Sequence, residues 1–367
     1  MPWTTPTLKT VRGQTRDFVL SALGAVSFVP NSALRIMSDA MSALAHLTML
    51  YLDWLAKQML PDTAETEFLD RHGVIWLKNA DGSLGRKAAS FAAGTVSVTG
   101  VDGTIVPEGT LLLYGADLNF QTTDEVTVGV GGTVELPVVC LTAGIVGNVD
   151  DGDVMTISVD GIDGAATVVE MGGGTDAESD DQLRERILLR IQQPPMGGDA
   201  SDYVLWALAV NGVTRAWCSP LEMGVGTVTV RFMMDDLRAG NGGFPLQEDV
   251  EVVREYLETQ RPVAIKDMFV EIPIAMPVDV KISEMSLDTE EVRAEIEDAL
   301  NAMFRKRAAP AHSTNGVPQP AQTMYEVWAA EAVSGIIDHF HLEMGDIEPA
   351  FPGQLGVLGS VIYSVNA

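Results

Sequence analysis

The chain of 367 residues is long enough to form two or three domains, and its composition, 46% hydrophobic and 20% charged, is that of a folded protein rather than a disordered one. Its formal net charge of -28 argues against nucleic acid and anionic membranes as partners, because both bind through Lys and Arg. The two cysteines are too few for a disulfide framework, and the N-terminal sequence lacks the basic and apolar regions of a signal peptide.

The first strong pattern is an amphipathic helix over residues 31–60, which Asn31 or Ser32 can cap and which Pro61 ends. Its most apolar part, 40–52, is too short to cross a bilayer. An apolar face this wide predicts a partner helix, in this chain or in another one. The candidate interface residues on this helix are Leu34, Met37, Met41, Leu44, Leu47, Tyr51 and Leu55.

The segments after this helix predict a second, short helix and then a β-rich domain. The short helix covers 63–72, with Thr63 or Thr66 as its cap. From Phe91 onward, runs of alternating Val, Thr, Ile and Leu lie between Gly, Pro and Asp turns over roughly 80 residues. Helices do not alternate with these strands, so the pattern does not indicate a parallel nucleotide-binding sheet.

The remainder of the chain mixes helices and strands. Helices are predicted at 179–193, 199–211, 246–260, 289–306 and 323–335, with strands between them and a strand in the C-terminal tail. Pro, Gly and Asn mark exposed linkers at 194–198, 238–245 and 309–322. These patterns predict an α+β region in which strands and helices together form one or two small sandwiches.

The predicted fold class is therefore α+β and multidomain, with an N-terminal helical segment, a central β-rich domain and C-terminal α+β domains. The predicted boundaries are 1–85 for the helical region, 86–178 for the β-rich domain, and 179–243 and 244–367 for two α+β domains. We expect the helical region to join a helix bundle or bind a partner.

The stretch GGGTDAESDDQLRERI, which begins at Gly172, has the form of a phosphate-binding turn that leads into a helix. Its first helical turn already carries Asp176, Glu178, Asp180 and Asp181, and the lysine of a phosphate loop is missing, so a nucleotide site is disfavoured. The spacing instead predicts two overlapping capping boxes, Thr175 with Glu178 and Ser179 with Gln182. We interpret the stretch as a hinge between domains.

Metal and catalytic motifs are weak. The Asp-rich stretches 148–154 and 160–181 lack the spacing of a calcium loop, which leaves only adventitious calcium binding open. His339 and His341 form an H-x-H pair that is better explained as a half-exposed strand edge than as a metal site. Because the motifs of serine, cysteine and metal hydrolases are also missing, we predict no catalytic, cofactor-binding or metal-binding residues.

Several runs together resemble the baseplate J family, the wedge proteins of contractile phage tails, which includes the Mu-type baseplate protein and relatives in R-type tailocins. The runs follow one another in the family's order, and they cover 91–126, 141–157, 172–188, 202–233, 260–273, 334–344 and 355–363. The most specific is GGGTDAESDDQLRERIL, and the N-terminal helix also looks like that of the Mu-type version. The segment before Gly85 and Arg86 departs from the family pattern by an inserted WLKN.

The resemblance implies a structural role without enzymatic activity or cofactor. It places the protein in the virion, in the tail baseplate, after assembly in the host cytoplasm. The implied partners are another copy of the chain, a tail protein I-type wedge partner, a lysozyme-like wedge component that joins wedge to sheath, and the central hub or spike. It also implies that the N-terminal helix joins an intermolecular bundle, and that the C-terminal domains close a ring and move on their hinges during contraction.

A β-rich adhesin or a tail-associated carbohydrate-active protein is the alternative. Sugar binding normally uses exposed aromatic side chains. Residues 91–170 contain only Phe91, Tyr114 and Phe120 as Phe or Tyr, and no Trp. This composition argues against the alternative.

Overall fold

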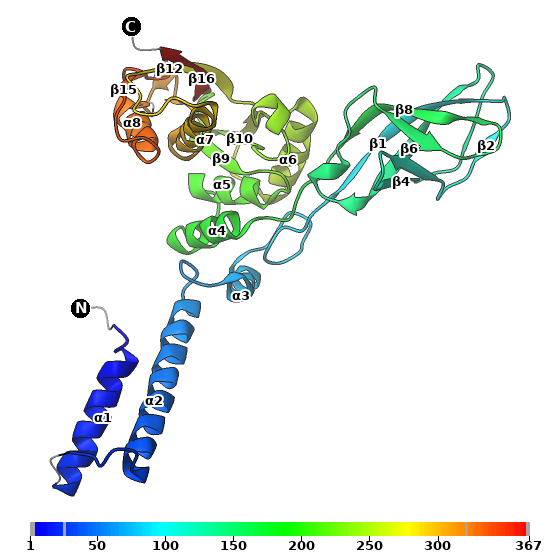
Figure 1. Cartoon of the computed structure of the whole chain (residues 1–367). Coiled ribbons are helices and arrows are strands. Elements are labelled where there is room, and N and C mark those ends of the chain that lie inside the picture. The colour runs from blue at the N-terminus through cyan, green and yellow to red at the C-terminus, as the bar shows by residue number, and fades with distance from the viewer. Residues whose placement is uncertain (1–3, 25–26, 320–321, 365–367) are drawn as a thin grey trace.

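The computed structural model describes residues 4–24, 27–319 and 322–364. Three parts project from a common centre: a hairpin of two long helices at the N-terminus, an arm made of β-strands, and a C-terminal body of helices and small sheets (Figure 1). This arrangement confirms the predicted α+β multidomain fold class.

The N-terminal hairpin consists of α1 (Leu8–Leu23) and α2 (Ala33–Gln58), which lie side by side (Figure 1). The Thr7 hydroxyl accepts a hydrogen bond from the Thr10 amide at the start of α1, and Gly24, in the left-handed conformation, ends that helix. The Ser32 hydroxyl caps α2 in the same way. Helix α2 agrees with the prediction, whereas α1 was not predicted.

Helix α3 (Thr66–Trp76) follows and connects the hairpin to the rest of the molecule. Its N-cap residue is Glu65, which makes no side-chain cap hydrogen bond, so the predicted caps Thr63 and Thr66 are wrong. The Thr63 hydroxyl instead donates to the carbonyl of Lys57 at the end of α2.

The arm is a closed barrel of six antiparallel strands in the order β1-β6-β4-β3-β7-β8. Its strands are β1 (Phe91–Gly100), β3 (Leu111–Tyr114), β4 (Leu118–Thr122), β6 (Thr133–Ala143), β7 (Val154–Ile157) and β8 (Ile162–Gly172). Strands β2 (Ile105–Val106) and β5 (Val126–Thr127) form a small ribbon beside it, and a 3₁₀ turn, η1 (Ile145–Gly147), follows β6. Alternate residues such as Val96, Val98, Leu136 and Val138 point inward and fill the barrel.

The part of the body next to the barrel contains α4 (Asp180–Gln192), α5 (Ala200–Ala209) and a sheet in the order β11-β10-β9. The strands are β9 (Arg215–Pro220), β10 (Thr227–Met233) and β11 (Asp267–Glu271). A 3₁₀ turn, η2 (Ala239–Asn241), and α6 (Gln247–Gln260) connect β10 to β11, which therefore pair in parallel. Val228, Val230 and Phe232 of β10 pack in one core with α5 and α6.

The C-terminal part has its own core around a sheet in the order β15-β12-β16. Its elements are β12 (Ile274–Ser283), α7 (Glu290–Arg307), β13 (Ser313–Thr314), β14 (Val317–Pro318), α8 (Glu326–Ser334), β15 (His341–Glu343) and β16 (Gln354–Ser364). Both three-stranded sheets pack against helices, α5 and α6 on the first and α7 on the second, which agrees with the predicted small sandwiches of strands and helices.

The predicted linker 309–322 is not fully exposed. Pro310, Ala311 and Ser313 are buried, because the segment runs across the body and exchanges backbone hydrogen bonds with Gly353 and with Gln354, the first residue of β16. Positions 320 and 321 lie outside the described residues. Pro and Gly correctly indicated an irregular segment, but they did not indicate whether it was solvated.

In residues 4–24, 27–319 and 322–364, no group of three or more His, Cys, Asp or Glu side chains could hold a metal ion. His341 lies in β15 beside Glu343, whereas His339 lies outside that strand. Among the same residues, no helix has both the length and the apolar character that a membrane span requires.

Candidate functional site

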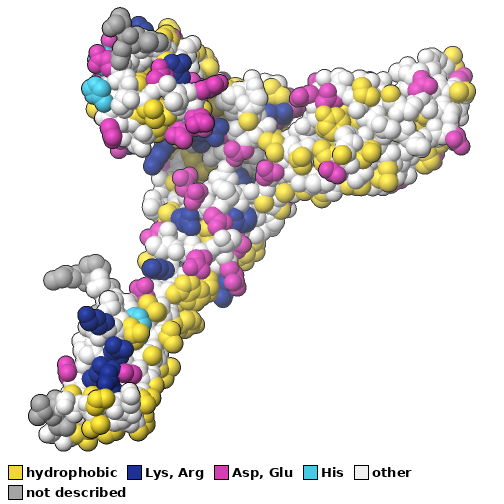
Figure 2. All heavy atoms as spheres, viewed as in Figure 1, with side chains coloured by type: hydrophobic (Ala, Val, Ile, Leu, Met, Phe, Trp, Pro, Cys, Tyr) yellow, Lys and Arg dark blue, Asp and Glu magenta, His cyan; other side chains and the backbone are white. Residues whose placement is uncertain are grey.

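The predicted interface residues on α2 form a continuous apolar stripe that the chain itself leaves uncovered (Figure 2). Leu44 is 62% exposed and Tyr51 is 59% exposed, although both are large apolar side chains. The other exposed members are Leu34, Met37, Met41 and Leu47, which are also at least half exposed. Leu55 differs, because it is half-buried against α3 and lines a cavity of about 250 Å³ between the two helices.

The stripe is exposed because α1 packs on the opposite side of α2. Ser38 and Ser42 of α2 are buried there, and small side chains allow the two helices to lie close together. The Arg16 guanidinium holds both carboxylate oxygens of Asp39 at 2.7 and 2.6 Å. The intramolecular partner helix therefore covers the polar side of α2 and leaves its apolar side to solvent.

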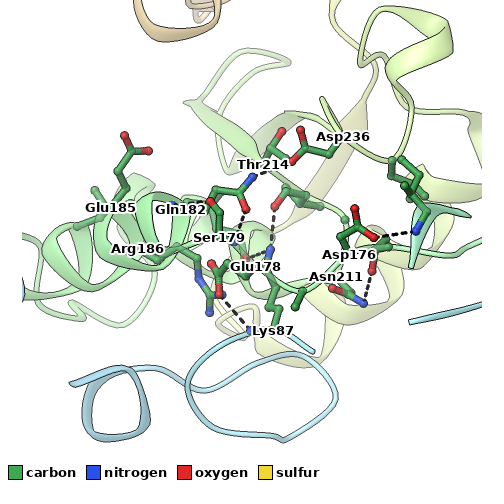
Figure 3. A pocket seen from close by; sticks show the side chains of 18 residues that line it. Lys87, Asp176, Glu178, Ser179, Gln182, Glu185, Arg186, Asn211, Thr214 and Asp236 are labelled. Carbon is green, nitrogen blue, oxygen red and sulfur yellow. Dashed lines mark hydrogen bonds and ion pairs between the residues drawn. The ribbon is translucent and has the colours of Figure 1, made fainter. Parts of the chain in front are cut away.

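A second feature is the junction where the barrel, α3, α4 and α5 meet (Figure 3). Lys87 lies just before the barrel and is almost fully buried. Its Nζ donates to the carbonyls of Leu208, Val210 and Val213 at 3.2, 3.2 and 2.9 Å. Burial, assisted by the nearby Arg186 charge, lowers the pKa of Lys87 to about 8. This lysine ties the base of the barrel to the end of α5.

Glu178 and Arg186 form the second tie. Both are buried, and the Arg186 Nη1 donates to the two carboxylate oxygens of Glu178 at 2.8 and 2.7 Å. The Arg186 Nη2 donates to Asn79, and the Glu178 carboxylate also accepts from the Lys87 amide. The two charges thus neutralise each other and use their remaining hydrogen-bonding capacity within the junction.

Arg86 forms the third tie, and it joins the hairpin side of the molecule to α4. Its Nε donates to Asp70 of α3 at 2.7 Å, and its Nη2 donates to Asp180 of α4 at 2.6 Å. Its Nη1 donates to the carbonyl of Glu178. One side chain therefore connects α3, the entry to the barrel and the start of α4.

The glycine-rich stretch serves this junction rather than a phosphate. The amide of Gly174 donates to Asn148, and the amide of Thr175 donates to the Ser90 hydroxyl, so neither amide is free for an anion. A Cβ on Gly174 would lie 2.5 Å from the Gly144 carbonyl oxygen, which explains why glycine is needed there. Close packing therefore accounts for Gly174, and a left-handed backbone conformation with φ of 79° accounts for Gly173.

Of the two predicted capping boxes, only one exists. Ser179 and Gln182 form it at the start of α4. The box of Thr175 with Glu178 is wrong, because Thr175 bonds to Ser90 and Asn211 while the Glu178 carboxylate is committed to Arg186. The roles of Lys87 and Arg186 were not predicted either.

The family models and the related proteins that match this chain all indicate the same family. Two family models match, the Baseplate J-like protein barrel domain over residues 95–174 and the Baseplate J-like central domain over residues 195–269. Baseplate protein gp47 of Escherichia phage Mu is 30% identical over 369 residues, which cover 97% of this chain and 95% of that protein. The Mu-like prophage FluMu protein gp47 of Haemophilus influenzae is 39% identical over 226 residues, 60% of this chain and 59% of that protein.

One solved structure, the baseplate of the anti-feeding prophage determined by cryo-EM, contains a chain that aligns with 98% of this chain and 91% of its own length. Its sequence identity is 10% and its TM-score is 0.45, a similarity too low to establish a common fold.

Proposed function

The chain belongs to the baseplate J-like family, and on that premise we propose that it is a structural component of the baseplate of a contractile phage tail or tailocin. In this proposal it forms part of the baseplate wedge, which assembles around the central hub and links to the sheath. The observation that carries the proposal is the uncovered apolar stripe on α2. Apolar surface of this extent on a projecting helix is typical of a site that another protein chain covers.

The structural evidence is stronger for some of the proposed partners than for others. The α2 stripe suits another helix, from a second copy of this chain or from a tail protein I-type wedge partner. The lysozyme-like wedge component, the hub and the location of the protein in the assembled virion are proposed from family membership alone. The three ties at the junction support the structural role, because they fix the directions in which the barrel and the hairpin leave the body.

The alternative of a sugar-binding adhesin is not favoured by the barrel. Phe120 is completely buried in the barrel core, and the Tyr114 hydroxyl donates to Asp153 at 2.6 Å. Phe91 is exposed, but it lies at the base of the barrel where the chain enters. These three side chains therefore offer no joint platform on which a sugar ring could stack.

The test is to express the tagged chain in cells that produce the intact particle, capture it, and image the captured material by negative-stain electron microscopy. Wild type should bring down tails that carry the tag at the baseplate end. Leu44→Asp should give a folded monomer that is absent from particles, because Leu44 is 62% exposed in the free chain. Val327→Asp, at a position 70% exposed on α8, is the matched control and should be incorporated normally.

The outcomes distinguish the proposal from its alternatives. A lone chain, recovered from cells whose tails assemble fully without it, would overturn the baseplate role. Normal incorporation of Leu44→Asp would leave that role intact but would show that the α2 stripe is not the assembly surface. Unfolding of the Leu44→Asp monomer would mean that the stripe belongs to a core within the chain.

A further inference from the structure

A cavity at the junction has no function in the assembly proposed above. It measures about 590 Å³ and opens between the base of the barrel, α4 and the segment after β10 (Figure 3). Part of its wall is apolar, formed by Leu189, Leu208 and Leu237. A cavity of this size and character is large enough to take a long side chain and a part of the backbone that carries it.

Three carboxylates stand around this apolar wall, and each comes from a different part of the chain. Asp176 follows the barrel, Glu185 lies on α4, and Asp236 follows β10; all three residues are exposed. Asp176 accepts a hydrogen bond from the Ile145 amide, and Asp236 accepts one from the Gln182 amide group. Within the residues that the structure describes, none of these three forms an ion pair.

The two cations that line the cavity form no ion pair with these three carboxylates, although Asp236 is close enough to act on the charge of Lys87. Lys87 is buried and donates to three backbone carbonyls, and Arg186 is paired with Glu178. The lining therefore has an excess of negative charge on its exposed side, next to an apolar wall. An anionic ligand would be repelled there, and the described carboxylates do not converge into a group that could hold a metal ion.

We propose that this cavity receives a lysine or arginine side chain from a neighbouring chain of the assembled baseplate. The aliphatic part of such a side chain would pack on Leu189, Leu208 and Leu237, while its cationic end would lie at the negatively charged rim that carries Asp176, Glu185 and Asp236. The inference rests on the proposed structural role, because it needs a partner chain at this position. Contact there would fix the angle between barrel and body from outside the chain.

The test uses intact particles in which Ala177, an exposed residue that lines the cavity, is replaced by a photo-cross-linking amino acid. After irradiation, the peptide joined to this position is identified by mass spectrometry. We expect a peptide of another chain with Lys or Arg within a few residues of the cross-link. The triple variant D176N/E185Q/D236N should reduce this product up to about fivefold, because one exposed ion pair contributes up to about fivefold in affinity. Asn at 176 and 236 keeps the oxygen that accepts the existing hydrogen bonds.

The matched control is E291Q/E295Q/D298N on α7, which removes the same number of exposed charges far from the cavity and should leave the product unchanged. The inference is overturned if the cross-linked peptide carries no cation, if the two triple variants behave alike, or if particles containing the chain give no product with another chain. Absence of the chain from particles would instead refute the baseplate role, and the inference would fail with it.

Discussion

Removing the charge of Glu178 should loosen the junction, and Glu178→Gln is the variant that isolates this effect. The side chains of Glu178 and Arg186 are 1% and 7% exposed, so the substitution leaves Arg186 buried without a counter-charge. Removing one partner of a buried ion pair costs about 3–5 kcal/mol. We expect about 3 kcal/mol here, the lower end of that range, because glutamine keeps one acceptor oxygen for the guanidinium.

The assay is amide hydrogen exchange followed by mass spectrometry, which reports local opening without assuming that a multidomain chain unfolds in one step. A loss of 3 kcal/mol corresponds to roughly hundredfold faster exchange in α4 and in the segment that leads into it. Asp181→Asn is the control, because that carboxylate is 93% exposed in its ion pair with Arg184, and it should change exchange by less than about threefold. Equal effects of the two variants, or none from Glu178→Gln, would refute the reasoning.

Two further substitutions test the same junction. Gly174→Ala should destabilise the barrel base by about 2 kcal/mol or more in thermal unfolding, because its Cβ would lie 2.5 Å from a backbone oxygen, whereas Gly172→Ala, with no atom within 4 Å of its Cβ, should be tolerated. The contribution of Lys87 to the free energy of unfolding should depend on pH. Its folded pKa of about 8 lies below the unfolded value of 10.5, so the unfolded state binds more protons between these pH values. Wild type should therefore gain unfolding free energy relative to Lys87→Met as pH rises from 8 to 10, by on the order of 1 kcal/mol per pH unit. The measurement is a urea titration of both proteins at these pH values. If the unfolding free energies of wild type and Lys87→Met differ by the same amount at every pH, Lys87 does not have the buried environment assigned to it.

The helical hairpin illustrates what periodicity predicts and what it omits. The spacing of apolar residues correctly predicted the helix that became α2, because a long amphipathic pattern is a strong local signal. Helix α1 was not predicted because its apolar pattern is weak. Within the described residues Val11 is its only buried side chain, and Gly13 lies in its middle. The side of α2 that α1 covers could not be predicted, since it depends on Ser38 and Ser42, which look like solvent-facing residues.

The junction shows the complementary limit. A capping box is a local pattern, and Ser179 with Gln182 formed one as predicted. Glu178 has the spacing of a capping residue, but its carboxylate binds the Arg186 guanidinium instead of a backbone amide of the helix start. Both side chains are buried, and segments that are distant in the sequence, such as the one that carries Asn79, pack around them. The charges of the glycine stretch argued against a phosphate site, since four carboxylates at a helix start oppose a phosphate, whereas its interpretation as a hinge between domains remains a prediction. The residues that hold the junction together, such as Lys87 and Arg186, could be identified only from the structure.

The family was predicted because its motifs occur in order from about residue 60 to the C-terminus, and the relatives confirm that prediction. Motif order carries information that single motifs lack, because each short run alone has many structural explanations. The domain boundaries and the interface on α2 remain predictions. The same is true of the named wedge partners.

The barrel leaves the body and returns to it at one place, since β1 and β8 are neighbouring strands with Ala93 opposite Gly172. A module attached by two adjacent chain ends can change in length or content without altering the path of the remaining polypeptide. The arm is in this sense a cassette, and its loops can diversify while the hairpin and the body keep their mutual geometry. Substitutions in the loops of the barrel can thus change its binding surface without changing the structure of the hairpin or the body.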